Sequence, residues 1–150
     1  MKAVIQKVAE ATVTIENKIQ ASIKVGMLIL LGITNNDTSE DIDWLSSKIA
    51  NIRLFNDVDT MMNLNVNDVN GQIIIVSQFT LFASTKKGNR PSYIYAAKPD
   101  VAIPMYNQFI DVLQTKINTK VETGIFAANM KVLIVNDGPV TIIIDTKNKE

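Results

Sequence analysis

Neither cysteine nor histidine occurs among the 150 residues of this chain. Their absence excludes a Ser-His-Asp triad, a cysteine nucleophile, a thiolate zinc site and any disulfide. It also removes the one side chain that titrates near neutral pH without perturbation. Catalysis therefore has to use hydroxyls, carboxylates, lysines, backbone dipoles or groups that a substrate supplies. The lack of cysteine also fits a reducing compartment.

An excess of either charge is missing as well, because 15 Lys and Arg balance 15 Asp and Glu. A net charge of zero argues against a protein that holds nucleic acid mainly by attraction to phosphates, but it permits contact with an RNA end. The longest apolar run, 26–33, is too short to span a membrane, and residues 1–7 lack the apolar core of a signal peptide. We therefore expect a cytoplasmic protein without a membrane contact.

Hydrophobic residues make up 47% of the sequence, which suffices for a real core in a chain of this size. Since no linker or internal repeat divides the chain, we predict a single domain over 1–150 with a charged, frayed tail over 146–150. Asp57 and Asp59 lie in a polar stretch, but no calcium-loop pattern follows them. We expect neither a metal nor a cofactor.

Alternating and continuous apolar runs predict the strands. These runs cover residues 2–8, 11–15, 19–23, 26–33, 72–76, 121–123, 131–136 and 139–145. The run 26–33 is apolar throughout, which is typical of a strand covered on both faces. The last two runs are interpreted as two strands that a turn at Gly138-Pro139 divides.

Two helices are predicted between the strands. The first begins at the N-cap Thr38, with a buried stripe formed by Ile42, Leu45, Ile49 and Ile52. The second runs from Pro99 to about Asn118, with an apolar face formed by Val101, Met105, Phe109, Val112 and Leu113. Residues 56–71 are interpreted as a loop with a hairpin entry, and 83–99 as an irregular stretch. This order indicates an α/β fold, in which helices pack on one side of a mixed sheet.

Polar side chains follow the apolar run 72–76 in the sequence Ser77-Gln78-Phe79-Thr80. Residues of this kind at a strand end either satisfy backbone groups or orient a ligand. The hydroxyls of Ser77 and Thr80 are weak nucleophiles, and no histidine can activate them. Gln78 offers both an acceptor and donors to a substrate.

A second polar segment, Asn136-Asp137-Gly138-Pro139-Val140-Thr141, follows the apolar run 131–135. Glycine adopts dihedral angles that other residues avoid, and a Gly-Pro bond can be cis at modest cost. The segment is either an ordinary turn or a binding surface made of main-chain atoms.

The densest basic cluster contains Lys86, Lys87 and Arg90. It is either a solvated loop or a contact for phosphates at a nucleic-acid end. Phe79 and Phe82 are either core residues or stacking surfaces for a base, and strand alternation would place them on opposite sides.

These segments together resemble the D-aminoacyl-tRNA deacylases over nearly the whole chain. The resemblance is carried by residues 1–8, 30–33, 62–64, 77–81, 87–92, 121–124, 126, 130 and 136–141. It implies a three-layer, barrel-like fold and hydrolysis of the ester that joins a D-amino acid, or glycine, to the 3′ end of tRNA. It also implies a homodimer whose two polar segments meet across the interface.

The resemblance further implies roles for individual residues. The catalytic group would be Ser77, Gln78, Phe79 and Thr80. The substrate-binding group would be Gly138, Pro139, Val140, Thr141, Asn136, Met130, Lys7, Lys87 and Arg90. The Gly138-Pro139 carbonyls would project into the partner's pocket as a chirality filter, with aminoacyl-tRNA as the ligand.

Three positions depart from the pattern of that family. Lys7 stands where many members carry Arg, Ala127 where Gly is common, and Asn129 where Asp is common. Lysine supplies a point charge rather than a planar fork, so it fixes a loop less rigidly. The alternative to an esterase is a protein on the same fold that binds aminoacyl-tRNA ends without catalysis.

Overall fold

The computed structural model describes residues 1–149. Its strands are β1 (Lys2–Ile15), β2 (Lys18–Ile23), β3 (Gly26–Gly32), β4 (Phe55–Asn56), β5 (Met62–Leu64), β6 (Gln72–Ser77), β7 (Val121–Thr123) and β8 (Met130–Asp145). Its helices are α1 (Ser39–Asn51), the 3₁₀ helix η1 (Phe79–Phe82) and α2 (Pro99–Gln114). No helix among the described residues is long and apolar enough to cross a membrane.

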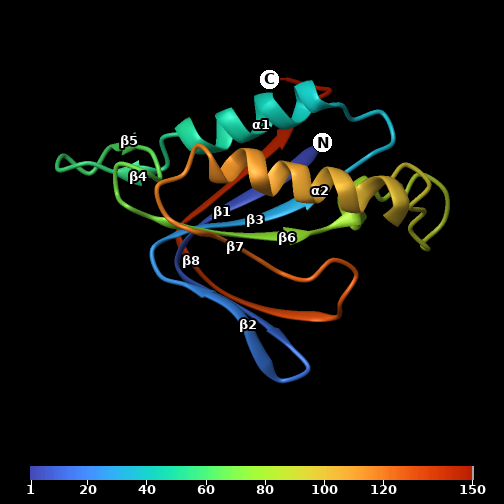
Figure 1. The fold of residues 1–150 in the computed structure, drawn as a ribbon, viewed down its shortest axis with the longest axis horizontal. Coiled ribbons are helices and arrows are strands. Elements are labelled where there is room, and N and C mark those ends of the chain that lie inside the picture. The colour runs from blue at the N-terminus through green and yellow to red at the C-terminus, as the bar shows by residue number, and fades with distance from the viewer. Residues whose placement is uncertain (150) are drawn as a thin grey trace.

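The main sheet mixes parallel and antiparallel pairs in the order β2-β1-β3-β6-β7, and β8 pairs with β1. β3, β6 and β7 run parallel, whereas β1 is antiparallel to β2, β3 and β8. Both α1 and α2 cover the same face of the sheet (Figure 1). The prediction of a mixed sheet with helices on one side is therefore confirmed.

The sheet curls because β1 changes partners along its length. Residues 2–8 of β1 pair with β3 and residues 11–15 pair with β2, while β8 follows β1 through both halves. One apolar cluster lies between the helices and the sheet, and a second, which includes Val8, Ala11 and Leu28, lies within the curl. This arrangement gives the three-layer, barrel-like shape that the resemblance implies (Figure 1).

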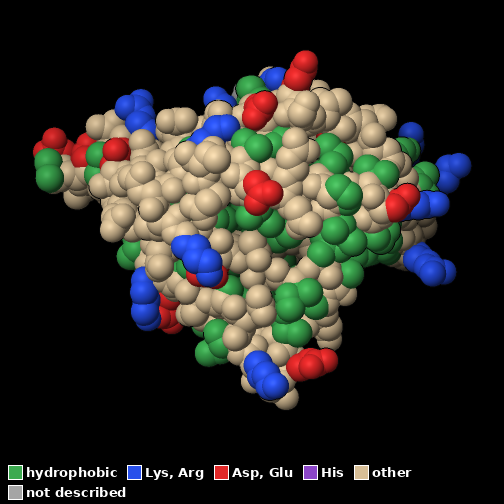
Figure 2. All heavy atoms as spheres, in the orientation of Figure 1, with side chains coloured by type: hydrophobic (Ala, Val, Ile, Leu, Met, Phe, Trp, Pro, Cys, Tyr) green, Lys and Arg blue, Asp and Glu red, His purple; other side chains and the backbone are tan. Residues whose placement is uncertain are grey.

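The segment between η1 and α2 is irregular, as predicted, but it is tied down at both ends. The Ser84 and Ser92 backbones exchange hydrogen bonds of 2.7 and 2.9 Å. The Ala97 N–H donates to the Ile33 carbonyl at 2.9 Å. Lys and Arg side chains gather at the end of the molecule that this segment forms (Figure 2).

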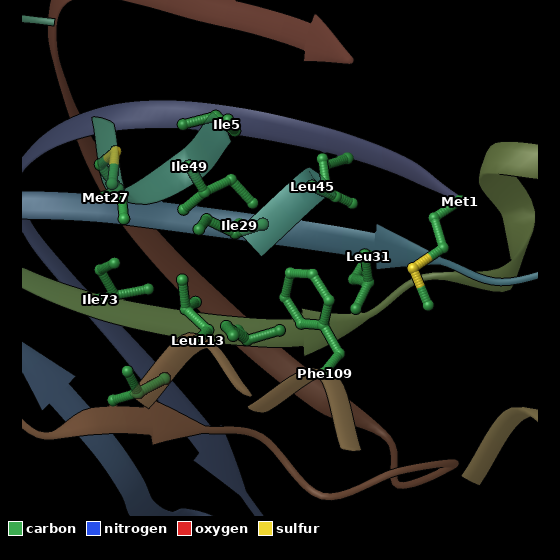
Figure 3. Packing of buried hydrophobic residues seen from close by; sticks show 14 of the residues in the cluster. Met1, Ile5, Met27, Ile29, Leu31, Leu45, Ile49, Ile73, Phe109 and Leu113 are labelled. Atoms are coloured by element: carbon green, nitrogen blue, oxygen red, sulfur yellow. The ribbon is translucent and has the colours of Figure 1, made fainter. Parts of the chain in front are cut away.

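Packing of the helices on the sheet forms the larger core. Leu45 and Ile49 of α1 and Phe109 of α2 lie over Ile29 and the neighbouring strands, and all are fully buried (Figure 3). The apolar run of β3 serves both clusters, because Met27, Ile29 and Leu31 face the helices and Leu28 faces the curl. The prediction that this strand is covered on both faces is confirmed.

Two strand predictions are wrong in the same way. β1 is one strand rather than two, and β8 is one strand that continues through Gly138-Pro139 rather than two strands divided by a turn. The chain does not reverse there because both halves of β8 pair with β1 in one direction. Gln6 of β1 pairs with Thr141 of β8, and Val8 pairs with Asn136. Residues 137–140 therefore form a bulge opposite the single residue Lys7.

The second helix differs from its prediction in face and length. Its buried residues are Ala102, Tyr106, Phe109 and Leu113, whereas Val101 is exposed. The helix ends at Gln114, whose side-chain amide donates to the Thr119 carbonyl at 3.0 Å and accepts the Val121 N–H at 2.8 Å. These two bonds hold a chain reversal that the hydrophobic pattern does not reveal.

The described part of the C-terminal tail is docked rather than frayed. The Met1 ammonium donates to the Asp37 carboxylate at 2.5 Å and to the Thr146 hydroxyl at 2.7 Å. The Lys147 ammonium donates to Asp41 at 2.7 Å. Residue 150 of the predicted tail lies outside the described residues.

Asp41 connects this tail to the start of α1. It accepts the Thr38 N–H at 2.8 Å, which is half of a capping box at the start of the helix. Burial alone would raise the pKa of the Asp41 carboxyl, but hydrogen bonds from Lys147, Thr146 and Thr38 outweigh it and hold that pKa well below its usual value. The charged carboxylate is therefore the stabilising form.

Asp41→Asn should lower the free energy of unfolding at pH 7 by about 2 kcal/mol, because a hydrogen-bonded charge is lost. A carboxyl whose folded pKa is depressed stabilises the fold above its unfolded pKa and ceases to do so as pH falls through the folded value. The gap between wild type and variant should thus narrow below about pH 4 in urea unfolding experiments. Asp43→Asn, an exposed change on the same helix, is the control, and a gap that stays constant with pH would contradict the assignment.

Candidate functional site

The first polar segment lies where β6 leaves the sheet. β6 runs parallel to β3, with Ser77 in register with Leu31, and the Gln78 N–H donates to the Leu31 carbonyl at 2.8 Å. The chain then turns into η1, which begins at Phe79. The carboxyl ends of adjacent parallel strands form a common place for a site, because polar groups there escape the buried sheet.

A cavity of about 620 Å³ opens beside this strand end. Its polar side chains are those of Ser77, Gln78, Tyr93, Lys98 and Asn129, set in an apolar wall. Members of that wall include Leu31, Ile33, Val76, Phe126, Met130 and Val132. A largely apolar cavity with a few convergent polar groups is the usual form of a small-molecule or nucleoside site.

Thr80 acts behind this cavity rather than in it. The Gln78 side-chain amide donates to the Thr80 hydroxyl at 2.5 Å, and Thr80 is not among the described residues that line the cavity. The hydroxyl therefore fixes the orientation of the Gln78 amide. This arrangement leaves the amide oxygen of Gln78 available to a ligand.

Phe79 is the exposed aromatic residue at the cavity mouth. Its side chain is 55% exposed and meets the Tyr93 ring edge to face, with centroids 5.0 Å apart. Phe82 lies outside this cavity, as strand alternation suggested, but the reason differs. The segment is a 3₁₀ helix, in which residues three apart lie on one side and are displaced along the axis by about 6 Å.

The opposite wall is the segment that joins β7 to β8. A Cβ at Gly124 would lie 2.5 Å from the Met130 sulfur, so any larger residue there would displace the Met130 side chain. The buried Tyr106 hydroxyl donates to the Ile75 carbonyl at 2.9 Å, and the Tyr106 ring meets Phe126 edge to face at 5.8 Å. Burial raises the pKa of Tyr106, so its hydroxyl stays protonated as a donor. The hydrogen bond and the ring contact of Tyr106 hold α2, β6 and the wall together.

The second polar segment forms the bulge in β8. The Gly138-Pro139 bond is cis, and Asp137, Gly138 and Pro139 are exposed. The buried Lys7 ammonium lies 3.0 Å from the Asp137 carboxylate and anchors the bulge to β1. None of residues 136–141 is among the described residues that line the cavity at Ser77, so one protomer does not bring the two segments together.

The model of the D-Tyr-tRNA(Tyr) deacylase family matches residues 4–145. This chain belongs to that family. The match spans both polar segments and almost all the described structure.

Full-length relatives of this deacylase family are highly similar to the chain. The D-aminoacyl-tRNA deacylase of Flavobacterium psychrophilum is 63% identical over 100% of both chains, and that of Bacteroides fragilis is 55% identical over 100% of both. A solved structure described as c-Myc DNA Unwinding Element Binding Protein is 37% identical, with a TM-score of 0.91 over 97% of this chain and 98% of its own.

A more distant structure shows only that the deacylase fold is shared. It is described as a probable eukaryotic D-amino acid tRNA deacylase and is 14% identical to the chain. Its TM-score is 0.81, over 95% of this chain and 97% of its own.

Several of the predicted substrate-binding residues lie away from the cavity at Ser77. Lys87 and Arg90 are exposed on the segment after η1, whereas Met130 lines the cavity itself. Tyr93 and Lys98 also line it, although the sequence does not indicate them as site residues. No sequence pattern marks these two residues, because they belong to an irregular segment without periodicity.

Ala127, the position at which the resemblance leads us to expect glycine, takes a backbone conformation that favours glycine. Its φ angle is 62°, in the left-handed region, and it lies in the cavity wall beside Phe126. An L-residue in that region costs about 1–2 kcal/mol, most of which glycine avoids. The departure therefore lowers stability at the wall of the candidate site.

Ala127→Gly should raise the free energy of unfolding by about 0.5–1 kcal/mol, because the relieved backbone cost exceeds the added chain entropy. Ala128→Gly is the matched control, because the φ angle of Ala128 is not in the left-handed region. Its free energy of unfolding should fall by about 0.4–1 kcal/mol. Denaturant titration measures both values. A loss of stability in both variants would show that Ala127 is not strained.

Proposed function

We propose that this chain hydrolyses D-aminoacyl-tRNA to free D-amino acid and tRNA, and so acts in tRNA proofreading. The observation that carries the proposal is the family match over residues 4–145, which includes the polar strand end at the cavity. The cavity would receive the terminal adenosine and the aminoacyl ester. Such a substrate places the enzyme in the cytoplasm.

The chemistry requires neither histidine nor cysteine. An aminoacyl ester is already activated, so positioning and stabilisation of the developing oxyanion supply much of the catalysis. Water attacks the carbonyl carbon, the ester bond breaks, and the ribose oxygen leaves with a proton. Ser77 and Gln78 orient the ester, and the Phe79 N–H, at the start of η1, donates to the oxyanion. The neighbouring ribose 2′-hydroxyl of the RNA assists.

Thr80 is not the nucleophile in this scheme. Its hydroxyl accepts a hydrogen bond from Gln78, lies outside the cavity lining, and has no histidine to remove its proton. Its contribution is to hold the Gln78 amide in place, which makes it a positioning residue.

Selection between D and L esters would come from the bulge at Gly138-Pro139. Backbone carbonyls there accept hydrogen bonds from the α-ammonium group and leave no room for a side chain on the L side. Val140 and Thr141 continue this wall. Glycine has no side chain, so glycyl-tRNA would also be hydrolysed.

The bulge reaches a cavity only if a second copy of the chain supplies it. It is exposed and lies outside its own cavity, and the same strand exposes Leu133, Val135 and Ile143. These apolar side chains suit a homodimer interface. Asn136 Oδ1 is buried without a hydrogen-bond partner among the described residues, and the assembly or the substrate would supply its donor. Light scattering that gives the monomer mass would rule out this assembly.

The basic residues after η1 would contact the RNA. Lys87 and Arg90 are exposed, so each would contribute modestly to affinity and more to the salt dependence of binding.

The decisive experiment is hydrolysis of D-tyrosyl-, L-tyrosyl- and glycyl-tRNA by the purified protein. The D and glycyl esters should be lost rapidly, while the L ester is spared because its side chain is excluded. Retained binding of tRNA without turnover would contradict the enzyme and favour a non-catalytic binder on this fold. Equal loss of the D and L esters would retain the hydrolase but contradict the filter.

Lys7→Met should reduce the ratio of D-ester to L-ester hydrolysis about tenfold, because the bulge loses its anchor at Asp137. Methionine keeps most of the buried stem, and Lys7→Arg should preserve the ratio because it restores the charge. Lys24→Met, which removes an exposed ion pair with Glu10, is the control. A Lys7→Met protein that spares the L ester as fully as wild type would remove Lys7 from the filter.

A further inference from the structure

We propose that a second hollow, beside the cavity at Ser77, binds the nucleotide that precedes the terminal adenosine of the RNA strand. This inference rests on the proposed function, since it extends the same RNA-end site. The hollow has a volume of about 640 Å³. Its lining is Lys2, Thr34, Phe82, Ala83, Ser84, Thr85, Lys86 and Tyr95. These residues supply aromatic rings, ammonium groups and hydroxyls.

The two hollows share one thin wall. Ile33 lines the cavity at Ser77, and the next residue, Thr34, lines the second hollow. Ala96 also lines the cavity, and the residue before it, Tyr95, lines the second hollow. η1 spans both, because it begins with Phe79 in the first and ends with Phe82 in the second. A strand that leaves the first hollow therefore meets the second without crossing the protein.

The second hollow offers two aromatic side chains, a packed Phe82 ring and an exposed Tyr95 ring on an anchored backbone. The Phe82 ring lies against Gly32, where an added Cβ would be 3.2 Å from the ring, and the Lys2 ammonium lies 5.1 Å from its centroid. The Tyr95 side chain is 60% exposed, but its carbonyl accepts a hydrogen bond from the Thr34 hydroxyl at 2.8 Å. An accessible aromatic ring on an anchored backbone suits base stacking, whatever the base.

The charge of the second hollow suits a phosphate. Its described lining residues include Lys2 and Lys86 and no carboxylate. Asp145 approaches Lys2 from outside at 3.6 Å, but this pair is partly exposed and weak, so the Lys2 ammonium can turn to a phosphate. Lys and Arg side chains gather at this end of a chain whose net charge is zero (Figure 2). This local excess of positive charge favours a polyanion.

A binding measurement tests the second hollow without reference to catalysis. The probes are a three-nucleotide RNA that ends in a 3′-adenosine and adenosine alone, titrated against Tyr95→Ala, Lys86→Ala and wild type. Tyr95→Ala should weaken the trinucleotide about tenfold and leave adenosine within about twofold, because one stacked base is lost. Lys86→Ala should reduce the slope of log K against log salt by about 0.7, the value for one phosphate contact on a single strand.

Matched variants separate the contact from a general effect on the protein. Tyr95→Phe keeps the ring and should bind the trinucleotide like wild type. Lys18→Ala removes an exposed lysine of β2, and it should leave the salt slope unchanged. Circular dichroism verifies folding; Tyr95 and Lys86 are both exposed, so their truncation leaves the core intact. Equal weakening of both probes by Tyr95→Ala, or weakening of neither, would overturn the proposal.

Turnover distinguishes this inference from the proposed function. With D-aminoacyl-tRNA, Tyr95→Ala should raise KM about tenfold and leave kcat unchanged, whereas turnover of D-aminoacyl-adenosine should be unaffected. A wild-type protein without deacylase activity would overturn the proposed function, while the trinucleotide titration would still decide whether the hollow binds RNA. Normal deacylation by wild type together with an unchanged KM in Tyr95→Ala would overturn the second hollow alone.

Discussion

The pairing of β1 with three other strands is the constraint on which the rest of the structure depends. β3 occupies one edge of β1 over its first half and β2 occupies it over the second, while β8 follows the other edge throughout. A strand shared in this way cannot stay flat, so the sheet curls and encloses a second apolar cluster. The register irregularity between Gln6 and Val8 falls within this curl and leaves the Gly138-Pro139 segment outside the ladder.

The two polar segments reach the surface for different physical reasons. Ser77 and Gln78 emerge because a buried parallel strand ends there, next to the end of β3. Gly138 and Pro139 emerge because a strand carries more residues than its partner can match. The first places side chains around a concave cavity, whereas the second presents main chain on a convex bulge. The different shapes suit a pocket and an insert, which is the relation that a paired assembly would exploit.

Much of the fold could be predicted from periodicity. The continuous apolar run of β3 and the spacing of Ile42, Leu45 and Ile49 led correctly to a covered strand and a helix on its face. The bulge in β8 could not be predicted, because Gly-Pro is equally typical of a turn and only pairing with β1 decides between them. The predicted face of α2 was wrong at Val101, because local spacing does not say which side of the helix meets the sheet.

The polar strand end of the candidate site could be predicted because Ser77 and Gln78 follow an apolar run, whereas its residues from the irregular segment could not. Tyr93, Tyr95 and Lys98 come from a segment without regular structure, and their positions depend on distant hydrogen bonds such as Thr34 to the Tyr95 carbonyl. Along β8, by contrast, Met130 lines one cavity and Gly138 lies about 26 Å further on at the usual strand rise. The number of residues between Met130 and Gly138 is therefore more tightly constrained than the types of those residues. Exposed positions such as Lys131 tolerate substitution, but one inserted residue would turn the side chains between Met130 and Gly138 to the opposite face of the sheet.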